Sequence, residues 1–235
     1  MVRNRTQKDL SLPNSSLKST ATDANAVMQN STQQNLLRKQ LREQFRAARQ
    51  ALSDAQQQQA SAAIAEHLTD IVNARPVRCV AAYIANDGEP SLEATIHALW
   101  QRGITVALPV LHPVVPNQLL FLRYHANTEM VANKFNIPEP RMRCQDIMPL
   151  SAIDLVCMPL VAFDAHGNRL GMGGGFYDRT LAGCSMNRYP NLQRVGIAHD
   201  CQYTEQLPVA SWDVPIAQIV TPCRSWQFNT SSGND

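Results

Sequence analysis

The chain has 235 residues, of which 44% are hydrophobic, so it is long enough to bury the core of one sizeable α/β domain. Its formal net charge is only +2 at pH 7, which gives no support for nucleic-acid binding and favours small-molecule partners. No apolar run reaches the ~20 residues that span a bilayer, and the N-terminus lacks the charged-then-apolar order of a secretory signal. We therefore expect a cytoplasmic protein that does not bind membranes.

The cysteines are scattered along the chain without a CxxC pair or any tight spacing that could hold zinc. Two of them lie inside apolar runs, where a free cysteine behaves as a small hydrophobic residue. We expect reduced thiols that mostly pack in the interior, and no disulfide framework. The six residues are Cys79, Cys144, Cys157, Cys184, Cys201 and Cys223.

The two ends of the chain are poor in large apolar residues. Residues 1–34 are rich in Ser, Thr, Asn and Gln and cannot bury enough surface to offset the entropy of ordering. Residues 229–235 have the same character. We therefore predict a disordered extension at 1–34, one domain at 35–228 and a disordered tail at 229–235.

Two amphipathic helices are predicted before the first strand. In the first, apolar residues recur at spacings of three and four, and basic residues occupy the other faces. The apolar set is Leu37, Leu41, Phe45, Ala48 and Leu52, and the basic set is Arg38, Lys39, Arg42, Arg46 and Arg49. Ser53 and Gln56 offer a capping box for the second helix. Its predicted buried stripe is Ala60, Ile64, Leu68 and Ile71.

The middle of the chain has the pattern of a parallel sheet. Residues 77–85 form a nearly continuous apolar run before the turn Asn86-Asp87-Gly88, as in a strand that is covered on both faces. A helix capped by Ser91 and ending near Gly103 follows, and residues 104–110 complete a βαβ unit. Further strands are predicted at 119–124, 153–163, 194–199 and 216–220, whereas 133–140 is too rich in turn residues for a regular element. The expected fold is a single α/β domain, Rossmann-like, with a mainly parallel sheet between two layers of helices.

A glycine-rich turn follows the strand at 153–163. Gly171, Gly173, Gly174 and Gly175 precede a short helix predicted at 177–181, and this order of strand, flexible turn and helix start suits phosphate binding. The P-loop lysine and the GxGxxG spacing are both missing, so a turn without a ligand is the alternative. Arg169 can neutralise phosphate, Tyr177 supplies an aromatic face, and Asp178 offers a hard oxygen for magnesium or simply stabilises a helix start.

The sequence around this turn resembles the 5-formyltetrahydrofolate cyclo-ligase family. The likeness is strongest at residues 159–181, PLVAFDAHGNRLGMGGGFYDRTL, and extends from about Leu37 to Trp226. It includes YIANDGE at 83–89, NKFNIPEP at 133–140 and LPVASWDVP at 207–215. The resemblance implies a single α/β domain and an enzyme that uses MgATP to convert 5-formyltetrahydrofolate into 5,10-methenyltetrahydrofolate. By resemblance, the formyl oxygen is first phosphorylated and the folate N10 then closes the ring as phosphate leaves.

The resemblance also implies the residues around ATP and magnesium. Positioning and charge neutralisation dominate phosphoryl transfer, so the expected catalytic groups are Arg169, Tyr177 and Asp178. The expected ATP-binding residues are Arg38, Lys39, Arg42, Gly171, Met172, Gly173, Gly174, Gly175, Phe176 and Tyr177. For the basic residues of the first helix, a solvated face is the alternative, and either Arg38 or Lys39 can be the residue that meets phosphate. The expected magnesium ligands are Asp178 and Asp213, although Asp213 can instead cap a turn before Pro215.

For the folate, the resemblance implies one carboxylate and three aromatic rings. Glu89 matches the residue that recognises the pterin, because its two oxygens can accept paired N–H donors. Tyr83, Phe135 and Tyr177 match positions that stack on flat rings, with core packing as the alternative for Tyr83 and Phe135.

One departure from the family concerns the glycine turn itself. Many relatives carry a basic residue at the positions of Met172 and Gly174, so Arg169, Arg179 or the first helix must contribute more charge here. This departure keeps a non-catalytic folate or nucleotide binder open as an alternative. A phosphate-handling α/β enzyme of another kind, such as a sugar-phosphate isomerase or CoA-transferase relative, is a second one. We expect ATP and Mg²⁺ as cofactors and a monomer that binds small molecules.

Overall fold

The structure is a computed structural model that describes residues 17–185, 188–209, 213 and 216–228. The chain divides into two units, Met1–Lys39 and Gln40–Asp235, and every strand lies in the second unit. No helix in the described part of the chain combines the length and the apolar character needed to cross a membrane.

The first helix is longer than the sequence predicted. Helix α1 spans Leu17–Gln50, so residues 17–34, expected to be disordered, are helical in the structure. Because this stretch contains neither proline nor glycine, nothing in its backbone stops a helix that the apolar stripe establishes further along. Residues 1–16 and 229–235 lie outside the described residues, and the domain division at 35 and 228 stays a prediction.

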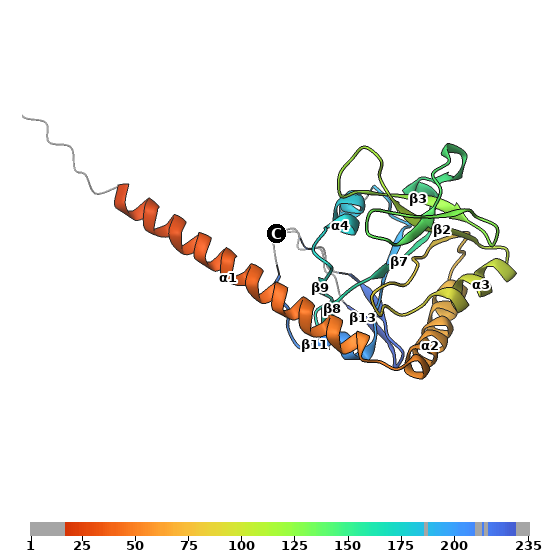
Figure 1. The fold of residues 1–235 in the computed structure, drawn as a ribbon, viewed down its shortest axis with the longest axis horizontal. Helices are drawn as coiled ribbons and strands as arrows, with labels where there is room; N and C mark the ends of the chain where they lie inside the picture. The colour runs from red at the N-terminus through yellow and green to blue at the C-terminus, as the bar shows by residue number, and fades with distance from the viewer. Residues whose placement is uncertain (1–16, 186–187, 210–212, 214–215, 229–235) are drawn as a thin grey trace, which may run out of the picture. The chain divides into compact units, whose positions relative to one another are not determined.

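The second unit contains a large, mainly parallel sheet (Figure 1). Its eight strands lie in the order β13-β12-β10-β7-β1-β2-β3-β6. The five central strands are parallel, and β3, β6 and β13 run antiparallel to their neighbours. The parallel strands are β1 (Cys79–Ala81), β2 (Thr105–Leu111), β7 (Leu155–Pro159), β10 (Gln193–Ile197) and β12 (Gln218–Val220). The antiparallel strands are β3 (Leu119–Tyr124), β6 (Ile147–Met148) and β13 (Ser225–Gln227).

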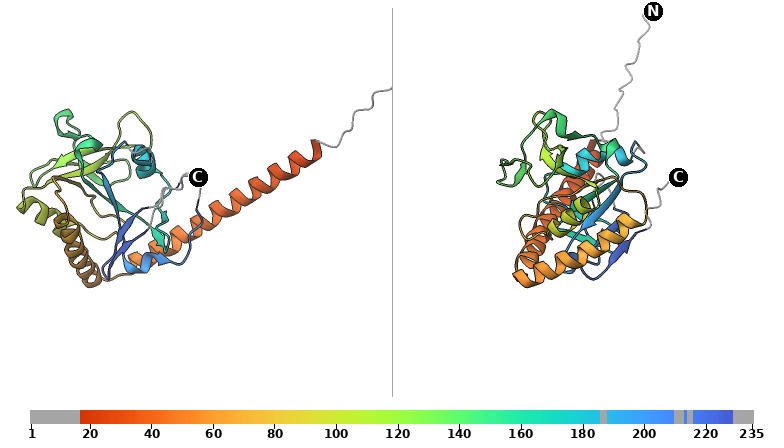
Figure 2. Two further views of the ribbon diagram at one scale, coloured as in Figure 1. Left: turned by 180° about the vertical axis from the view of Figure 1, so that it is seen from behind. Right: turned by 90° about the vertical axis from the view of Figure 1, so that its right-hand side faces the viewer.

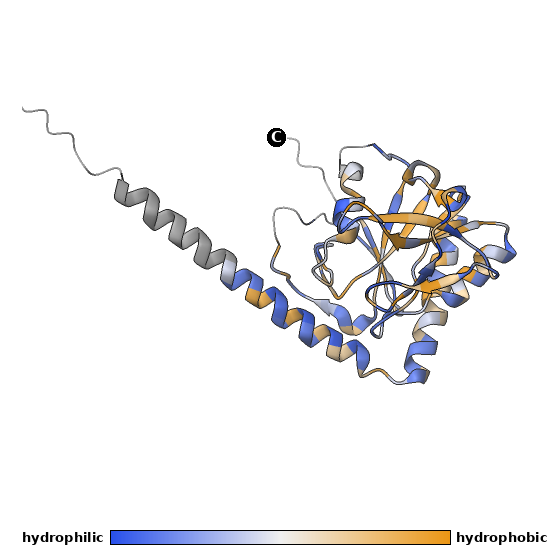
Figure 3. Ribbon diagram, turned by 45° about the horizontal axis from the view of Figure 1, so that its top comes forward, coloured by the Kyte–Doolittle hydropathy of each residue, from blue (hydrophilic) through white to orange (hydrophobic). Residues whose placement is uncertain are grey.

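Helices pack on both faces of this sheet. Alternate strand residues point to opposite sides, so Val80 and Leu155 face α2 (Asp54–Asn73) and α3 (Glu93–Gln101). Ala81 and Val156 instead face the side covered by the end of α4 (Phe176–Thr180), which α5 (Ala182–Ser185) follows. Figure 2 gives two further views of the sheet and its helices, and in Figure 3 the hydrophobic colour concentrates on the strands while the helices carry both colours. The predicted α/β class and helical layers are confirmed.

The predicted capping of α2 is confirmed in detail. Ser53 Oγ accepts from the backbone of Gln56, whose side chain accepts from the backbone N–H of Ser53. The buried residues are Ala60, Ile64, Leu68 and Val72, and the predicted Ile71 is only partly buried.

The single strand predicted at 153–163 is wrong, because β7 ends at Pro159 and a separate strand begins at Ala162. This strand, β8 (Ala162–Asp164), lies in a three-stranded sheet between β9 (Arg169–Leu170) and β11 (Tyr203–Thr204). The buried carboxylate of Asp164 ends β8, since it accepts from the backbone N–H groups of His166 at 2.9 Å and Asn168 at 3.0 Å. The turn from β8 to β9 thereby leads the chain toward the glycine-rich segment.

The expectation of no regular element at 133–140 is also wrong. Strands β4 (Met130–Ala132) and β5 (Pro138–Pro140) form an antiparallel ribbon. The side chain of Asn133 closes the turn between them by accepting from the N–H groups of Phe135 at 2.9 Å and Ile137 at 3.2 Å. Three short 3₁₀ segments complete the fold: Cys144–Asp146, Leu150–Ala152 and Asp200–Gln202.

The described cysteines are free thiols, in agreement with the predicted absence of a disulfide framework among them. Cys79 and Cys157 are buried, and burial raises the pKa of their thiols to about 11 and about 12. Cys144, Cys201 and Cys223 are exposed rather than packed. The side chain of Cys184 lies outside the described residues.

Candidate active site

The candidate site lies at the carboxyl ends of the central strands. Strand β1 pairs with β2 on one side and with β7 on the other, so the chain changes direction across the sheet at β1. In open α/β sheets, ligands bind outside the carboxyl ends of the strands at such a switch point. The segment after β1 carries Tyr83 and Glu89, and the segment after β7 leads to the glycine-rich turn.

Glu89 carries a largely buried carboxyl group, with 12% of its side chain exposed, close to two phenols. Desolvation by burial raises its pKa to about 7, while Arg49 and the backbone N–H of Asn86 act in the opposite direction. Burial also raises the pKa of both Tyr83 and Tyr177, and the charge of Glu89 adds to each shift. The structure therefore brings together three of the predicted folate-binding residues.

Tyr83 itself is a core residue in this structure. Its side chain is almost completely buried, and its hydroxyl donates to the carbonyl of Pro90 at 2.8 Å. These contacts favour the packing alternative for Tyr83, and its predicted contact with folate stays a prediction.

Phe135 differs from Tyr83 because 52% of it is exposed. Its ring meets the ring of Phe176 edge to face, with 5.9 Å between the centroids, and Lys134 Nζ lies 5.2 Å from its centroid. The turn between β4 and β5 thus places an exposed aromatic ring beside the start of α4. This exposure suits stacking on a flat ligand and argues against simple core packing.

The glycine-rich turn requires glycine at two positions. Gly173 and Gly175 have φ angles of +95° and +64°, which favour glycine over other residues. A Cβ atom on Gly175 would lie 2.5 Å from Arg179 Nη1, and one on Gly174 would lie 2.6 Å from the ring of Phe176. The helix that follows, α4, has only five residues, so backbone geometry rather than a long helix dipole is what this turn offers an anion.

Three arginines converge on this turn. Arg42 Nε donates to the carbonyl of Gly171 at 2.8 Å, and Arg179 Nη1 donates to that of Gly174 at 2.6 Å. Arg169 lies directly before the turn with 8% of its side chain exposed, and its Nε has no hydrogen-bond partner among the described residues. Flanking elements therefore bring three guanidinium groups to a turn in which Met172 and Gly174 carry no charge, and their contact with phosphate stays a prediction.

Asp178 forms an ion pair with Arg169 at this turn. The carboxylate oxygens of Asp178 are hard donors of the kind that Mg²⁺ prefers, which makes the residue chemically suitable as a ligand. Asp213 is half-buried, but residues 210–212 and 214–215 on either side lie outside the described chain. No cluster of three His, Cys, Asp or Glu side chains suited to a metal occurs among the described residues.

Arg38 and Lys39 belong to the first unit, Met1–Lys39. Their predicted contact with phosphate stays a prediction. Arg42, in the second unit, reaches the glycine turn from the basic helix.

Sequence reasoning missed two residues beside Glu89. Arg49 was assigned to an outer face of the first helix, which is wrong, because its side chain is completely buried. It lies four residues after Phe45, on the buried stripe itself. A charged residue on an apolar stripe was therefore the feature of the sequence that could have revealed it. Its guanidinium bonds to Asp87, which lies in the Asn86-Asp87-Gly88 turn that the sequence identified only as a turn.

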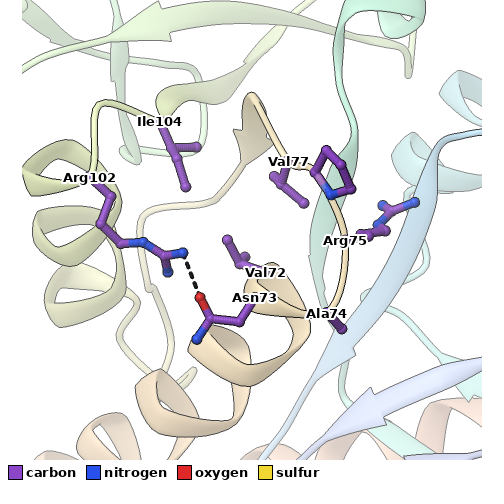
Figure 4. A pocket seen from close by; sticks show the side chains of 8 residues that line it. Val72, Asn73, Ala74, Arg75, Val77, Arg102 and Ile104 are labelled. Atoms are coloured by element: carbon purple, nitrogen blue, oxygen red, sulfur yellow. Dashed lines mark hydrogen bonds between the residues drawn. The ribbon is translucent and has the colours of Figure 1, made fainter.

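A surface depression of about 550 Å³ lies far from this site, at the amino ends of β1 and β2 (Figure 4). Val72, Val77 and Ile104 form part of its wall, and Arg102 Nη2 donates to Asn73 Oδ1 at 2.6 Å. The guanidinium of Arg75 is directed away from Val72 and Ile104 and donates to backbone carbonyls. This depression contains none of the predicted site residues.

Comparisons with known proteins identify the family of the chain. Residues 34–222 match the model of the 5-formyltetrahydrofolate cyclo-ligase family. The chain is 44% identical over 184 residues to the 5-formyltetrahydrofolate cyclo-ligase of Escherichia coli (strain K12), covering 78% of this chain and 100% of that protein. It is 44% identical over 183 residues to the cyclo-ligase of Haemophilus influenzae, covering 78% of this chain and 96% of that protein.

Solved structures give the same result for the fold. The 5,10-methenyltetrahydrofolate synthetase of Aquifex aeolicus superposes with a TM-score of 0.68 at 26% identity, covering 85% of this chain and 96% of that one. The 5,10-methenyltetrahydrofolate synthetase of Mycoplasma pneumoniae has a TM-score of 0.62 at 23% identity and covers 79% of this chain and 98% of that one. The expected family and enzyme class are thus confirmed, and the chain belongs to the 5-formyltetrahydrofolate cyclo-ligase family.

Proposed function

We propose that the protein converts 5-formyltetrahydrofolate into 5,10-methenyltetrahydrofolate with consumption of MgATP and release of ADP and phosphate. Family membership supports the reaction class. The proposal rests on two features found in one candidate site. One is the largely buried carboxyl group of Glu89, and the other is a glycine turn contacted by three arginines. One half suits the N–H edge of a pterin, and the other suits a triphosphate.

On the folate side, the two oxygens of Glu89 accept paired N–H donors from the pterin edge. The exposed ring of Phe135 stacks on the flat part of the substrate, and Tyr177 closes the buried end of the site. Enclosure by these side chains keeps water away from the formyl group and strengthens the contact with Glu89.

On the phosphate side, the turn at 171–175 offers backbone N–H groups, and the guanidinium groups of Arg42, Arg169 and Arg179 neutralise charge. The Nε of Arg169 is a donor without a partner in the part of the chain that the structure describes. This group is therefore suited to orient the terminal phosphate.

Asp178 and Asp213 are the proposed magnesium ligands. The ion pair between Asp178 and Arg169 holds the carboxylate at the glycine turn, where its hard oxygens would bind the ion. A magnesium ion held there would neutralise charge on the transferred phosphate.

The proposed reaction has two steps. The formyl oxygen attacks the γ-phosphorus, so an O–P bond forms and the bond to ADP breaks, which gives a phosphorylated imidate. N10 of the folate then attacks the formyl carbon and loses its proton, and the C–O bond breaks as inorganic phosphate leaves. In this scheme Arg169, Tyr177 and Asp178 orient and neutralise the reacting groups, and no side chain acts as a nucleophile.

The remaining proposals concern context. We place the catalytic domain at residues 35–228 and propose that the protein acts in the cytoplasm as a monomer on small molecules, without nucleic-acid or membrane partners.

Truncation tests the proposed domain boundary. Removal of residues 1–34 should leave the catalytic constants within about twofold of the full chain, because the family match begins at residue 34.

A non-catalytic folate or nucleotide binder is the second candidate, favoured by Met172 and Gly174 in place of basic residues. Purified protein should be mixed with 5-formyltetrahydrofolate and MgATP while the near-ultraviolet absorbance of the methenyl product is followed. Product formation that stops when ADP replaces ATP supports the ligase. Absence of product from a folded protein that still binds folate would support the binder.

A further inference from the structure

Arg49 is a fully buried cation at the carboxyl ends of the central strands. Its Nε donates to the carbonyl of Asp87 at 2.7 Å, and its Nη2 donates to Asp87 Oδ2 at 2.8 Å. Its Nη1 donates to the carbonyl of Leu160, just after β7, at 3.1 Å. The same Nη2 lies 3.8 Å from Glu89 Oε1. One guanidinium therefore links α1, the turn after β1 and the end of β7 while its charge stays beside Glu89.

The turn that carries Glu89 has an unusual backbone, which Arg49 helps to hold. Asp87 and Gly88 have φ angles of +54° and +74°, and the N–H of Glu89 donates to the carbonyl of Asn86 at 3.0 Å. A Cβ atom on Gly88 would lie 3.2 Å from the carbonyl oxygen of Arg49. A left-handed aspartate is uncommon and persists where its surroundings hold it. The contacts from Arg49 thus hold Glu89 in place as well as the turn.

A second arginine of α1 and a histidine after β10 also contact this turn. Arg46 forms two hydrogen bonds to the carboxylate of Asp87, at 2.6 and 2.9 Å. On the β10 side, His199 Nε2 lies 3.2 Å from the carbonyl of Gly88. Gln202 Nε2 donates to the carbonyl of Leu160 at 2.6 Å, the acceptor that Arg49 also uses. Arg49 is the member of this network whose charge also reaches Glu89.

The charged and titratable groups that face Glu89 come from three parts of the chain: α1, the segment after β1, and α4. Arg49 of α1 is the cation, and Asp87 of the same turn is an anion whose pKa the guanidinium groups of Arg46 and Arg49 lower to about 2. Tyr83 after β1 and Tyr177 of α4 stay neutral, since burial raises the pKa of both phenols. Among these groups Arg49 is the one that favours the carboxylate form of Glu89.

We propose that Arg49 is a positioning residue for folate recognition, which sets both the place and the charge of Glu89 through its bonds to Asp87 and Leu160. This inference rests on the proposed function, in which Glu89 accepts the N–H donors of the pterin. Arg49 does not contact the reacting atoms. Its effect on folate reaches the substrate through Glu89.

The competing explanation is that Arg49 only stabilises the turn and has no effect on the charge of Glu89. The ionisation of Glu89 distinguishes the two explanations. Three variants divide the roles of the guanidinium. Arg49→Met removes the charge, and Arg49→Lys keeps a charge but loses the fork of donors. Asp87→Asn removes the opposing negative charge with a residue that tolerates a left-handed backbone. If Arg49 only stabilises the turn, all three should lower stability without a consistent change in the ionisation of Glu89.

The first experiment follows the carboxyl carbon of Glu89 by NMR as pH is varied, in the unliganded full-length protein, with Glu89→Gln identifying the signal. The midpoint should lie near pH 7 in the wild type. It should rise by roughly one unit or more in Arg49→Met and fall in Asp87→Asn. The matched control Arg78→Met, an exposed arginine at the other end of β1, should leave it unchanged. A midpoint that stays within about 0.3 units in folded Arg49→Met overturns the inference.

The second experiment measures steady-state kinetics of Arg49→Lys, which also serves if Arg49→Met does not fold. The KM for 5-formyltetrahydrofolate should rise about tenfold while the KM for ATP stays the same. An unchanged folate KM together with an unchanged Glu89 midpoint in Arg49→Lys would overturn the inference. If the wild-type protein forms no methenyl product, the proposed function fails, but the NMR titration still decides whether Arg49 controls the ionisation of Glu89.

Discussion

The two halves of the candidate active site are built differently. The turn that carries Glu89 is held by Arg49 of α1, which also bonds to the backbone carbonyl of Leu160 after β7, and by His199 after β10. Only 12% of the Glu89 side chain is exposed. The glycine turn at 171–175 is more open, and the carbonyls of Gly171 and Gly174 accept hydrogen bonds from arginine side chains. In the proposed function, the folate half is therefore organised before its ligand arrives, whereas the proposed phosphate half holds guanidinium groups close to an open turn.

The largest effect should come from the phosphate half. Asp178→Asn should lower turnover by roughly 10²–10³-fold, because it removes a charge placed to act on the transferred phosphate. Folate binding should change little, since Asp178 is not part of the enclosure around Glu89. Steady-state kinetics and a folate-binding titration test both statements, with the exposed Asp70→Asn on α2 as the matched control. A loss of folate affinity equal to the loss of turnover would show that the two halves are not separate.

A smaller effect is expected from the folate half. Glu89→Gln should raise the KM for 5-formyltetrahydrofolate by about tenfold to a hundredfold, because a hydrogen bond to a charged group becomes a neutral one. The KM for ATP should stay the same. Kinetics with each substrate varied in turn measure the split, and Glu93→Gln provides an exposed control. Equal changes in both KM values would contradict the assignment of Glu89 to folate.

The burial of Glu89 also predicts how stability depends on pH. Its pKa rises from 4.5 in the unfolded reference to about 7 in the folded protein, so the folded state holds an extra proton between these values. The free energy of unfolding should fall as pH rises through this window, by up to roughly 3 kcal/mol. Urea unfolding at pH 5 and pH 7.5 tests this, and Glu89→Gln should show a flatter dependence than the wild type. Parallel curves for the two proteins would exclude a raised pKa.

The smallest effect concerns the missing loop cation. Met172 is 53% exposed, so Met172→Lys should be tolerated and should restore a charge beside the phosphates. We expect the KM for ATP to fall by about twofold to fivefold, in line with the modest energy of an exposed ion pair. Met172→Gln, of similar length without the charge, is the control. An unchanged KM in the lysine variant would indicate that Arg42, Arg169 and Arg179 already provide sufficient charge.

Local sequence patterns predicted the fold well where one helix or strand periodicity of apolar residues dominated a segment. The βαβ unit and the apolar runs predicted a parallel sheet, and Ser53 with Gln56 predicted the start of α2, because these features depend on neighbouring residues. The break after Pro159 was missed, because the run at 153–163 is apolar throughout and only Asp164 with its turn shows where a second sheet begins. Composition likewise understated the length of α1, which continues through polar residues.

The candidate site was predicted mainly by resemblance, and the residues that the prediction missed depend on tertiary contacts. The glycine turn, Arg169 and Asp178 are close in sequence, so a local pattern revealed them together. Arg49 and Asp87 are 38 residues apart and meet only after α2 and β1 have formed. No local period predicts that an arginine on an apolar stripe will be buried against a turn.

The order of strands in the large sheet has a consequence for behaviour at high concentration. Its outermost strands, β6 and β13, are only two and three residues long. Unpaired strand edges are templates on which another polypeptide can add a strand, and the risk grows with the length of the free edge. The apolar parallel strands lie in the interior of the sheet, so the sheet offers another polypeptide little free backbone on which to add a strand.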